Sequence, residues 1–428
     1  MRDPLGFLSS LIGGAPVLRI QLGTLPVVLV CDPDLTWNVL LDDRTFDKGG
    51  PFYERSREVA GGGLGTCPHT RHRRQRRLCQ PAFRIDRLPG YAEVATASVQ
   101  ARLRSWCDGH EVDVVSQMSE LTVDIAVRTM FSTSLPEQVI RRAASDVGVL
   151  AAGLFRRTVM PSALNRVPTP ANRRFLLARD RVRGLGAELI RHRRGGGDDQ
   201  GDLLSALISA HDPRSPGAAA TLTDEELIDQ VFTFFLAGAE TTASTLVWAL
   251  YLLGRDPRSA STVHAEVDTA LAGRTAVVDD LTRLPFLSRV VTETLRLYPP
   301  GWLLTRITTA ATLIDDISIP AGTTVAVSPH LIHRRPDLYL DPDAFVPDRW
   351  IGLAPPRTAF IPFGAGARRC IGDQFALTTA TLALAHITAA WRLSPVRAAP
   401  TVVALKDLPA PRCLPMRLST RQPQSLQC

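Results

Sequence analysis

A single cysteine inside a glycine-rich segment constrains this chain more than any other feature. The segment 363–372 holds Cys370 with Gly364, Gly366 and two arginines, between a proline-rich stretch and an alanine- and leucine-rich run. Glycine permits tight bends and close approach of a flat ligand, while nearby cations and a helix start favour a thiolate. The pattern predicts a metal-ligating thiolate in a turn; the alternative is an inert cysteine in an ordinary loop.

The composition is that of a globular protein. Hydrophobic residues make up 45% and charged residues 21% of 428 residues, near the usual averages, and this length suits one large core or several smaller domains. The formal charge is +7, and 47 of the 49 basic residues are arginine, because Lys48 and Lys406 are the only lysines. Total charge does not choose between nucleic acid, anionic lipid and acidic protein as a partner.

The cysteines and apolar stretches predict a cytoplasmic protein with no transmembrane segment. The seven cysteines are scattered, without CxxC spacing, as expected in a reducing compartment. The first 14 residues lack the layout of an export signal. The long apolar stretch 231–253 contains Glu240, which a lipid-facing helix would not tolerate well. We therefore expect a buried helix there.

Local patterns predict a mainly helical chain with a small β region. Residues 17–22 and 27–30 are two β-prone runs separated by Gly23 and Pro26, which predicts a hairpin. Thr223 with Glu226 forms a capping box that starts a long helix. Other expected features are helices over much of 92–194, about 260–272, 285–298 and 372–391, a break at 195–202, strand structure in 317–327 and a loop at 342–362.

Glu293 and Arg296 lie three residues apart and share one face of a predicted helix. By itself such a pair is usually a solvated surface ion pair of little energetic weight. Pro347–Trp350, which contains Arg349, follows later in the chain.

Within the long predicted helix, Thr241 follows Glu240 and a run of small residues that includes Gly238. The hydroxyl of Thr241 can compete for the carbonyl of Ala237, four residues earlier, and open the helical ladder. A hydroxyl and a carboxylate placed together suit proton delivery. In the alternative, Thr241 only caps a kink and Glu240 pairs with an arginine.

The segment 71–77 is strongly basic, with His72 and Arg76 one turn apart. Without further context it could be a nucleic-acid or lipid patch, or a solvated helix face.

Taken in order, these motifs resemble those of the cytochrome P-450 family. Residues 363–372 match its haem-binding signature, Phe-x-x-Gly-x-Arg-x-Cys-x-Gly, at every fixed position. The resemblance covers nearly the whole chain and implies one P-450 domain over 1–428. The expected fold is mainly α with a small β-rich region, and a b-type haem buried between the long distal helix and the cysteine loop. Thiolate ligation by Cys370 would favour cleavage of the O–O bond.

The resemblance also implies roles for the other residues. Glu240 and Thr241 match the family's proton-delivery pair, and Glu293, Arg296 and Arg349 match a buried structural network. The residues that match haem propionate ligands are His72, Arg76, Arg306 and Arg368.

The implied activity is insertion of one oxygen atom of O2 into a C–H bond of an apolar small molecule. Electrons would come from a ferredoxin and its reductase, with an acidic ferredoxin attracted to Arg73, Arg74, Arg77 and Arg369, and no nucleic-acid partner is expected. Segments 2–7, 46–51 and 168–175 are similar to bacterial P-450s that oxidise terpenes, pentalenene oxygenases among them, which carry a proline-rich leader that is missing here. The expected pocket residues are Phe232, Phe235, Leu236, Trp302, Leu303 and Leu304.

Three other functions are open from the sequence. A haem-thiolate peroxygenase, dehydratase or isomerase would not need the acid and alcohol at Glu240 and Thr241. A non-catalytic haem sensor would be expected to carry a partner domain. A basic nucleic-acid binder would explain residues 71–77 but not the cysteine segment.

Overall fold

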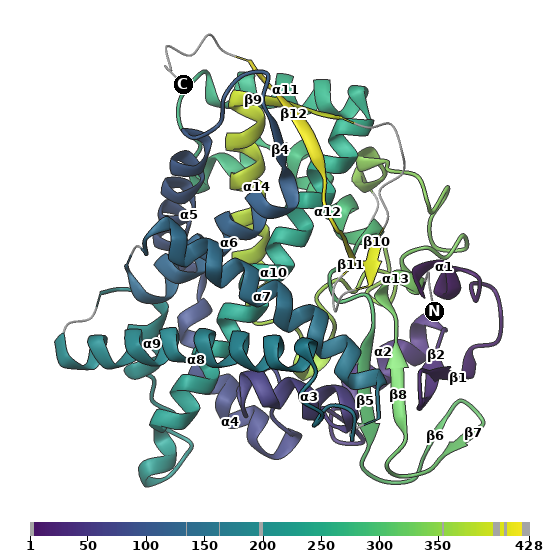
Figure 1. The fold of residues 1–428 in the computed structure, drawn as a ribbon. Helices are drawn as coiled ribbons and strands as arrows, with labels where there is room; N and C mark the ends of the chain where they lie inside the picture. The colour runs from purple at the N-terminus through teal and green to yellow at the C-terminus, as the bar shows by residue number, and fades with distance from the viewer. Residues whose placement is uncertain are drawn as a thin grey trace.

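Helices make up most of the computed structural model and frame the smaller sheets (Figure 1). The structure describes residues 4–133, 135–161, 163–196, 200–352, 355–396, 403–405 and 409–421. The helices are α1 (Pro4–Ser9), α2 (Pro33–Leu41), α3 (Gly50–Ala60), α4 (His69–Cys79), α5 (Leu88–Leu103), α6 (Val114–Phe131), α7 (Glu137–Val159), α8 (Pro170–Gly196), α9 (Leu203–Ile208), α10 (Asp224–Arg255), α11 (Pro257–Leu271), α12 (Pro285–Leu297), α13 (Pro329–Ile332) and α14 (Asp373–Ala390).

The strands gather in small sheets. They are β1 (Val17–Leu22), β2 (Leu25–Val30), β3 (Phe46–Asp47), β4 (Glu111–Asp113), β5 (Leu304–Thr308), β6 (Thr312–Ile314), β7 (Ile317–Ile319), β8 (Thr324–Val327), β9 (Trp391–Pro395), β10 (Val403–Leu405), β11 (Pro409–Pro411) and β12 (Pro415–Thr420). The largest sheet has the order β1-β2-β8-β5-β3, and β4, β12 and β9 form another.

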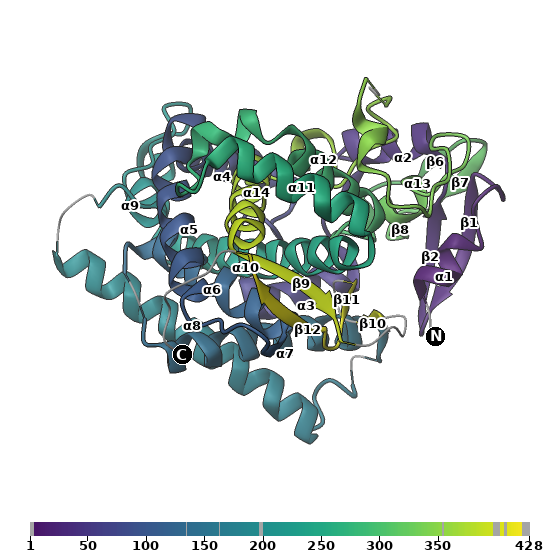
Figure 2. The same cartoon turned by 90° about the horizontal axis from the view of Figure 1, so that it is seen from above.

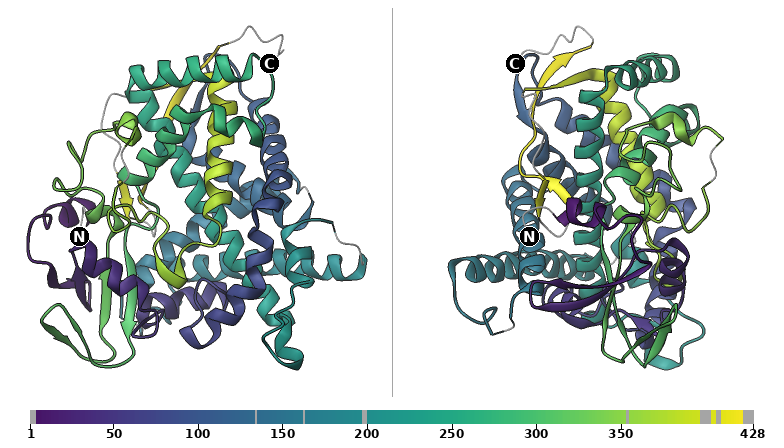
Figure 3. Two further views of the ribbon diagram at one scale, coloured as in Figure 1. Left: turned by 180° about the vertical axis from the view of Figure 1, so that it is seen from behind. Right: turned by 90° about the vertical axis from the view of Figure 1, so that its right-hand side faces the viewer.

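The predicted hairpin is confirmed, because β1 and β2 pair antiparallel with Val17 opposite Val30. β2 then pairs in parallel with β8, nearly 300 residues later, with Val28 opposite Val325. Figure 3 shows this sheet to one side of the helical body. Within the sheet, β5 pairs antiparallel with β8.

Helix α10 crosses the centre of the molecule (Figure 2). Its predicted capping box is confirmed: the Glu226 backbone N–H donates to Thr223 Oγ1 over 3.2 Å, and the Thr223 N–H donates to Glu226 Oε2 over 3.1 Å. Both bonds use groups that a helix end otherwise leaves without partners. In the described part of the chain, no helix is long and apolar enough to cross a membrane.

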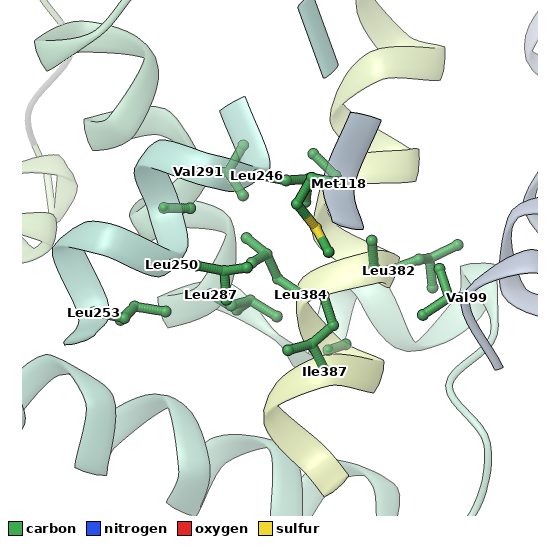
Figure 4. Close-up of a cluster of buried hydrophobic side chains, with 14 of the residues drawn as sticks. Val99, Met118, Leu246, Leu250, Leu253, Leu287, Val291, Leu382, Leu384 and Ile387 are labelled. Carbon is green, nitrogen blue, oxygen red and sulfur yellow. The ribbon is translucent and has the colours of Figure 1, made fainter. Parts of the chain in front are cut away.

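The main core forms where α10 packs against α6, α12 and α14. Leu246, Leu250, Met118, Leu287 and Leu384 converge there from these four helices (Figure 4). Burying aliphatic side chains of this size contributes roughly 1.5–3 kcal/mol each. This packing holds α10 and α14 firmly, and the cysteine segment immediately precedes α14.

The other helix predictions agree with the structure to within a few residues. α11 and α12 lie where they were expected, and α14 covers most of 372–391. The break after α8 falls partly on residues 197–199, which lie outside the described residues. The expected loop at 342–362 contains a short 3-10 helix at Pro347–Trp350.

Candidate functional site

The cysteine segment is a closed turn at the start of α14. The Cys370 backbone N–H donates to the carbonyl of Phe363 over 3.0 Å and closes the turn. Gly366 has a φ of 65°, and a Cβ there would lie 2.6 Å from the carbonyl oxygen of Leu40. Only glycine fits both conditions, so the segment is shaped by its own backbone and by α2.

Cys370 lies between a cavity inside the protein and a hollow on its surface. Its position between these two spaces accounts for its exposure to solvent. Protein atoms surround it closely all the same, and this burial raises the pKa of the thiol, against the lowering effects of the Gly372 N–H, Arg76 and Lys48. The helix start and Arg76 therefore do favour the thiolate, as expected, but in the protein by itself desolvation of the charged form outweighs them.

A cavity of about 310 Å³ lies beside Cys370. Its walls come from the cysteine loop, α10, α12 and β5, and they are largely apolar. This volume is at the lower end of the range of about 300–1,000 Å³ for small-molecule sites. The apolar lining includes Phe83, Ala126, Met130, Phe234, Val291, Leu295 and Leu304.

Thr241 and Gly238 of α10 line the same cavity as Cys370. The Thr241 hydroxyl donates to the carbonyl of Ala237 over 2.6 Å, as the spacing predicts. A Cβ on Gly238 would meet no atom within 4 Å, so the helix surface is open there. A small ligand atom could therefore approach both the Thr241 hydroxyl and the α10 backbone.

Glu240 lines a different and smaller cavity, of about 50 Å³, between α6, α7 and α10. Adjacent helical residues point about 100° apart, so an acid directly before Thr241 cannot face the same wall. The polar side chains beside it in this cavity are Ser119, Thr122 and Ser244.

One edge of the main cavity is basic. Arg306 and Arg368 line it and are buried, at 4% and 8% exposure. Arg306 donates to the Tyr53 hydroxyl over 3.3 Å, and Arg368 donates to Asp47 over 2.7 Å. His72 is also buried and close enough for Arg368 and Lys48 to lower its pKa, but burial is the larger cause, and together they bring the pKa to about 3.

Lys48 is the member of this basic edge that sequence reasoning missed. It lines the cavity beside Tyr53 and donates from Nζ to the carbonyl of Gly65 over 2.8 Å. Burial, with Arg306 and Arg368 nearby, lowers its pKa to about 7. The sequence did contain a signal that could have pointed to Lys48, because it is one of only two lysines among 49 basic residues.

Arg76 lies outside the main cavity. It borders the surface hollow with Cys370 and Arg369 and donates to the carbonyl of Arg369 over 2.6 Å and to Gln80 over 2.9 Å. Of the four arginines expected to attract an acidic partner, three are paired instead: Arg74 with Glu226, Arg77 with Asp212, and Arg369 with Asp373.

The acid and arginine of α12 form the expected network. Glu293 accepts two bonds from Arg296, each 2.8 Å long, and one from Arg349 over 2.9 Å. Trp350 adds an indole N–H bond of 3.0 Å. Glu293 and Arg296 are fully buried, so the interpretation as a solvated surface pair is excluded.

The expected apolar pocket is only partly correct, since Leu304 alone of the six residues lines the main cavity. Side chains alternate along a strand, and Leu303 of the segment leading into β5 instead faces a small separate hollow with Trp302. Phe232, Phe235 and Leu236 pack in or against a core cluster.

The positive charges at the edge of the cavity fit a ligand that carries acidic groups. The expected haem is such a ligand. Asp43 and Asp47 pair with Arg368, but among the described residues Lys48 and Arg306 have no carboxylate partner. Burying a cation without a counter-charge is costly, and a ligand carboxylate would remove that cost. The residues present therefore fit a haem with Cys370 toward the iron and the basic edge toward the carboxylates.

Comparison with known proteins gives a consistent result. The family model described as Cytochrome P450 matches residues 14–406. Cyclooctat-9-en-7-ol 5-monooxygenase of Streptomyces melanosporofaciens is 41% identical over 92% of this chain and 86% of its own length. Pentalenene oxygenase of Streptomyces avermitilis is 40% identical over 99% and 94%. The crystal structure of the cytochrome P450DA heme domain superposes with a TM-score of 0.88 at 28% identity, covering 99% and 94% of the two chains.

Proposed function

This chain belongs to the cytochrome P450 family and is a P450 monooxygenase, and on that premise we propose that it hydroxylates or further oxidises a terpenoid, including sesquiterpenes. The observation that carries the proposal is one cavity lined by Cys370, by Thr241 and by apolar side chains. Such walls suit a hydrocarbon that offers few polar groups for recognition. The relatives named for pentalenene and cyclooctat-9-en-7-ol support a terpenoid over other apolar molecules.

The cofactor in this proposal is haem b, whose iron Cys370 would bind through its thiolate. A thiolate-ligated haem supplies the reductive activation of O2. Arg306, Arg368 and Lys48 hold its carboxylates, because guanidinium and ammonium groups form strong charge-assisted bonds with carboxylates. His72, whose pKa Arg368 and Lys48 help to lower, and Arg76, which borders the hollow outside Cys370, are the further carboxylate ligands in this proposal.

Thr241 and Glu240 move protons toward the cavity in this proposal. The Thr241 hydroxyl can switch its hydrogen bond from the carbonyl of Ala237 to a group in the cavity. Glu240 supplies protons from the neighbouring side of α10, through the small cavity that it lines. The two residues therefore act in sequence across the helix.

The electron donor that we propose is a ferredoxin, itself reduced by a ferredoxin reductase. The hollow outside Cys370 is bordered by Arg76, Arg84 and Arg369, and it is the short route from the surface to the thiolate. An acidic partner would be attracted there. Because Arg74, Arg77 and Arg369 already have acidic partners, we expect Arg73 and Arg76 to carry most of this attraction.

We propose that the enzyme acts in the cytoplasm. Five of its cysteines, Cys31, Cys67, Cys79, Cys370 and Cys413, are free thiols, as is usual for proteins of reducing compartments, whereas Cys107 is disulfide-bonded. A nucleic-acid partner is not proposed, since Arg74 and Arg77 of the basic segment 71–77 are paired with Glu226 and Asp212.

The decisive experiment is the visible spectrum of the dithionite-reduced protein with carbon monoxide. A red-shifted Soret band, lost in Cys370→Ser, would support thiolate ligation by this residue. Turnover of candidate terpenes under ¹⁸O2, with a ferredoxin and its reductase, should then place one labelled oxygen in the product. Haem binding without the shifted band, or product oxygen derived from water, would contradict the proposal.

A further inference from the structure

The glycine-rich loop between α3 and α4 has no role in the function described so far. It comprises residues 61–67, of which Gly61, Gly62, Gly63 and Gly65 are glycine; we call it the strap. α3 and α4 follow each other at the lower edge of the molecule in Figure 1. The strap passes between the start of α10 and the basic edge of the cavity.

Three successive carbonyls of the strap hold three cationic side chains. Lys48 Nζ donates to the oxygen of Gly65 over 2.8 Å. Arg57 Nη2 donates to the oxygen of Thr66 over 2.8 Å, and Arg368 Nη1 to the oxygen of Cys67 over 2.9 Å. Because Lys48 and Arg368 line the cavity, the position of the strap determines where this positive charge lies.

The strap is itself fastened to α10 by two buried side chains. The Gly62 N–H donates to Asp229 Oδ2 over 2.7 Å, and the Leu64 N–H donates to Gln230 Oε1 over 2.9 Å. Asp229 is 7% exposed and Gln230 fully buried. Water cannot easily replace such acceptors, so losing one leaves a buried N–H without a partner.

Glycine is needed for this close approach. A Cβ on Gly63 would lie 2.5 Å from the backbone oxygen of Asp229, and a helix backbone cannot move aside as a side chain can. A single methyl group at Gly63 would therefore push the strap away from α10 without removing any existing hydrogen-bonding group.

Asp229 also connects the strap to α8. Its Oδ1 accepts from Arg183 over 3.3 Å, and Arg183 donates to the carbonyl of Val59, just before the strap, over 2.8 Å. One carboxylate thus joins α8, α10 and the strap.

We propose that Asp229 is a positioning residue for the cofactor: through the strap it sets the positions of Lys48 and Arg368 against the cofactor carboxylates. This inference rests on the proposed haem site. Asp229 would act on the cofactor through the carbonyl groups of the strap. It lies on the same helix as Thr241, twelve residues earlier. Asp229 lies outside the walls of the main cavity, so its effect on the cofactor must be indirect.

The test compares Asp229→Ala with a matched control, Asp146→Ala. Asp146 is equally well buried, at 3% exposure, and accepts from Arg181 of α8 over 2.7 Å, but it does not touch the strap. Haem dissociation to a scavenger globin and the reduction potential are measured for both holoproteins. For Asp229→Ala we expect dissociation about 10- to 100-fold faster, as on loss of an outer-shell partner, and a more negative potential, because displaced cations no longer favour the reduced iron.

Two more variants separate positioning from a general loss of stability. Asp229→Asn keeps an oxygen for the Gly62 N–H and should restore most of the wild-type values. Gly63→Ala leaves Asp229 intact and should show the faster haem dissociation and the more negative potential expected of Asp229→Ala. This holds even if Asp229→Ala itself fails to fold. Wild-type dissociation and potential in Gly63→Ala, or equal changes in Asp146→Ala, would overturn the inference. A wild-type protein that binds no haem would overturn the proposed function as well.

Discussion

Two buried groups of cationic side chains in this protein differ in how far acidic side chains neutralise their charge. In the network on α12, Glu293 accepts bonds from Arg296, Arg349 and Trp350, and backbone carbonyls take further N–H groups of Arg296. At the cavity edge, Arg368 pairs with Asp43 and Asp47, but Lys48 and Arg306 have no acidic partner among the described residues. A network that only supports the fold is complete in itself, whereas a binding edge leaves charge for its ligand.

Glu293→Gln should give the largest effect. Removing the carboxylate charge leaves Arg296 and Arg349 as buried cations without a counter-charge, which costs about 3–5 kcal/mol in the free energy of unfolding. Denaturation in urea, with and without haem, measures it. The control Glu137→Gln, at an exposed pair with Arg141, should change stability by less than about 0.5 kcal/mol. Similar losses in the two variants would contradict the contrast.

Arg306→Gln should separate binding from folding. Because Arg306 has no acidic partner among the described residues, we expect little loss of stability in the haem-free protein. Haem affinity should fall by about tenfold or more, since a charge-assisted bond contributes roughly 1.5–3 kcal/mol. Haem titration with parallel thermal melts measures both. A large loss of haem-free stability would place Arg306 with the structural network instead.

Lys48→Met tests whether the cavity edge carries unneutralised positive charge, through the pH dependence of the stability of the haem-free protein. The pKa of Lys48 is about 7 in the folded chain, against an ordinary value of 10.5 for a lysine exposed to water. Between these two pH values the unfolded state binds more protons, so stability rises with pH. Below about pH 7 the charged lysine destabilises the haem-free protein. Lys48→Met should therefore stabilise it there by about 1 kcal/mol or more, and remove the rise toward pH 10. An unchanged pH profile would contradict this.

The smallest effect is expected at the surface. Arg369 pairs with Asp373 over 2.7 Å, so Arg369→Gln should change the rate of reduction by ferredoxin less than Arg73→Gln, which removes an exposed arginine without an acidic partner in the described structure. Stopped-flow reduction at several salt concentrations measures this. If both variants were reduced at the same rate and with the same salt dependence, arginines without acidic partners would not be what attracts the ferredoxin.

Much of the fold could be predicted because it depends on neighbours in the sequence. The Thr223 capping box, the strands of the hairpin and the bounds of α12 follow from residues a few positions apart, and the structure confirms them. The bond from Thr241 to Ala237 is of the same kind. The order of the motifs was enough to place Glu293 and Arg296 in a buried network.

The site was less predictable, because its members come from distant segments. Sequence placed Glu240 beside Thr241, but helix geometry turns them toward different cavities. It placed Arg76 with Arg306, although the two lie in different hollows. Lys48 was overlooked because nothing in its own neighbourhood indicates that β5 and the cysteine loop would bring Arg306 and Arg368 to it.

The sequence by itself determined the helices, their caps and the family's motifs, since each depends on interactions within a few residues along the chain. Only the tertiary structure decided which charges are neutralised. Arg368 meets Asp47 across 321 positions, and Arg74 meets Glu226 across 152. Whether a buried charge finds a partner depends on which segments pack together, and among the described residues this packing leaves Lys48 and Arg306 at the cavity edge without a carboxylate partner.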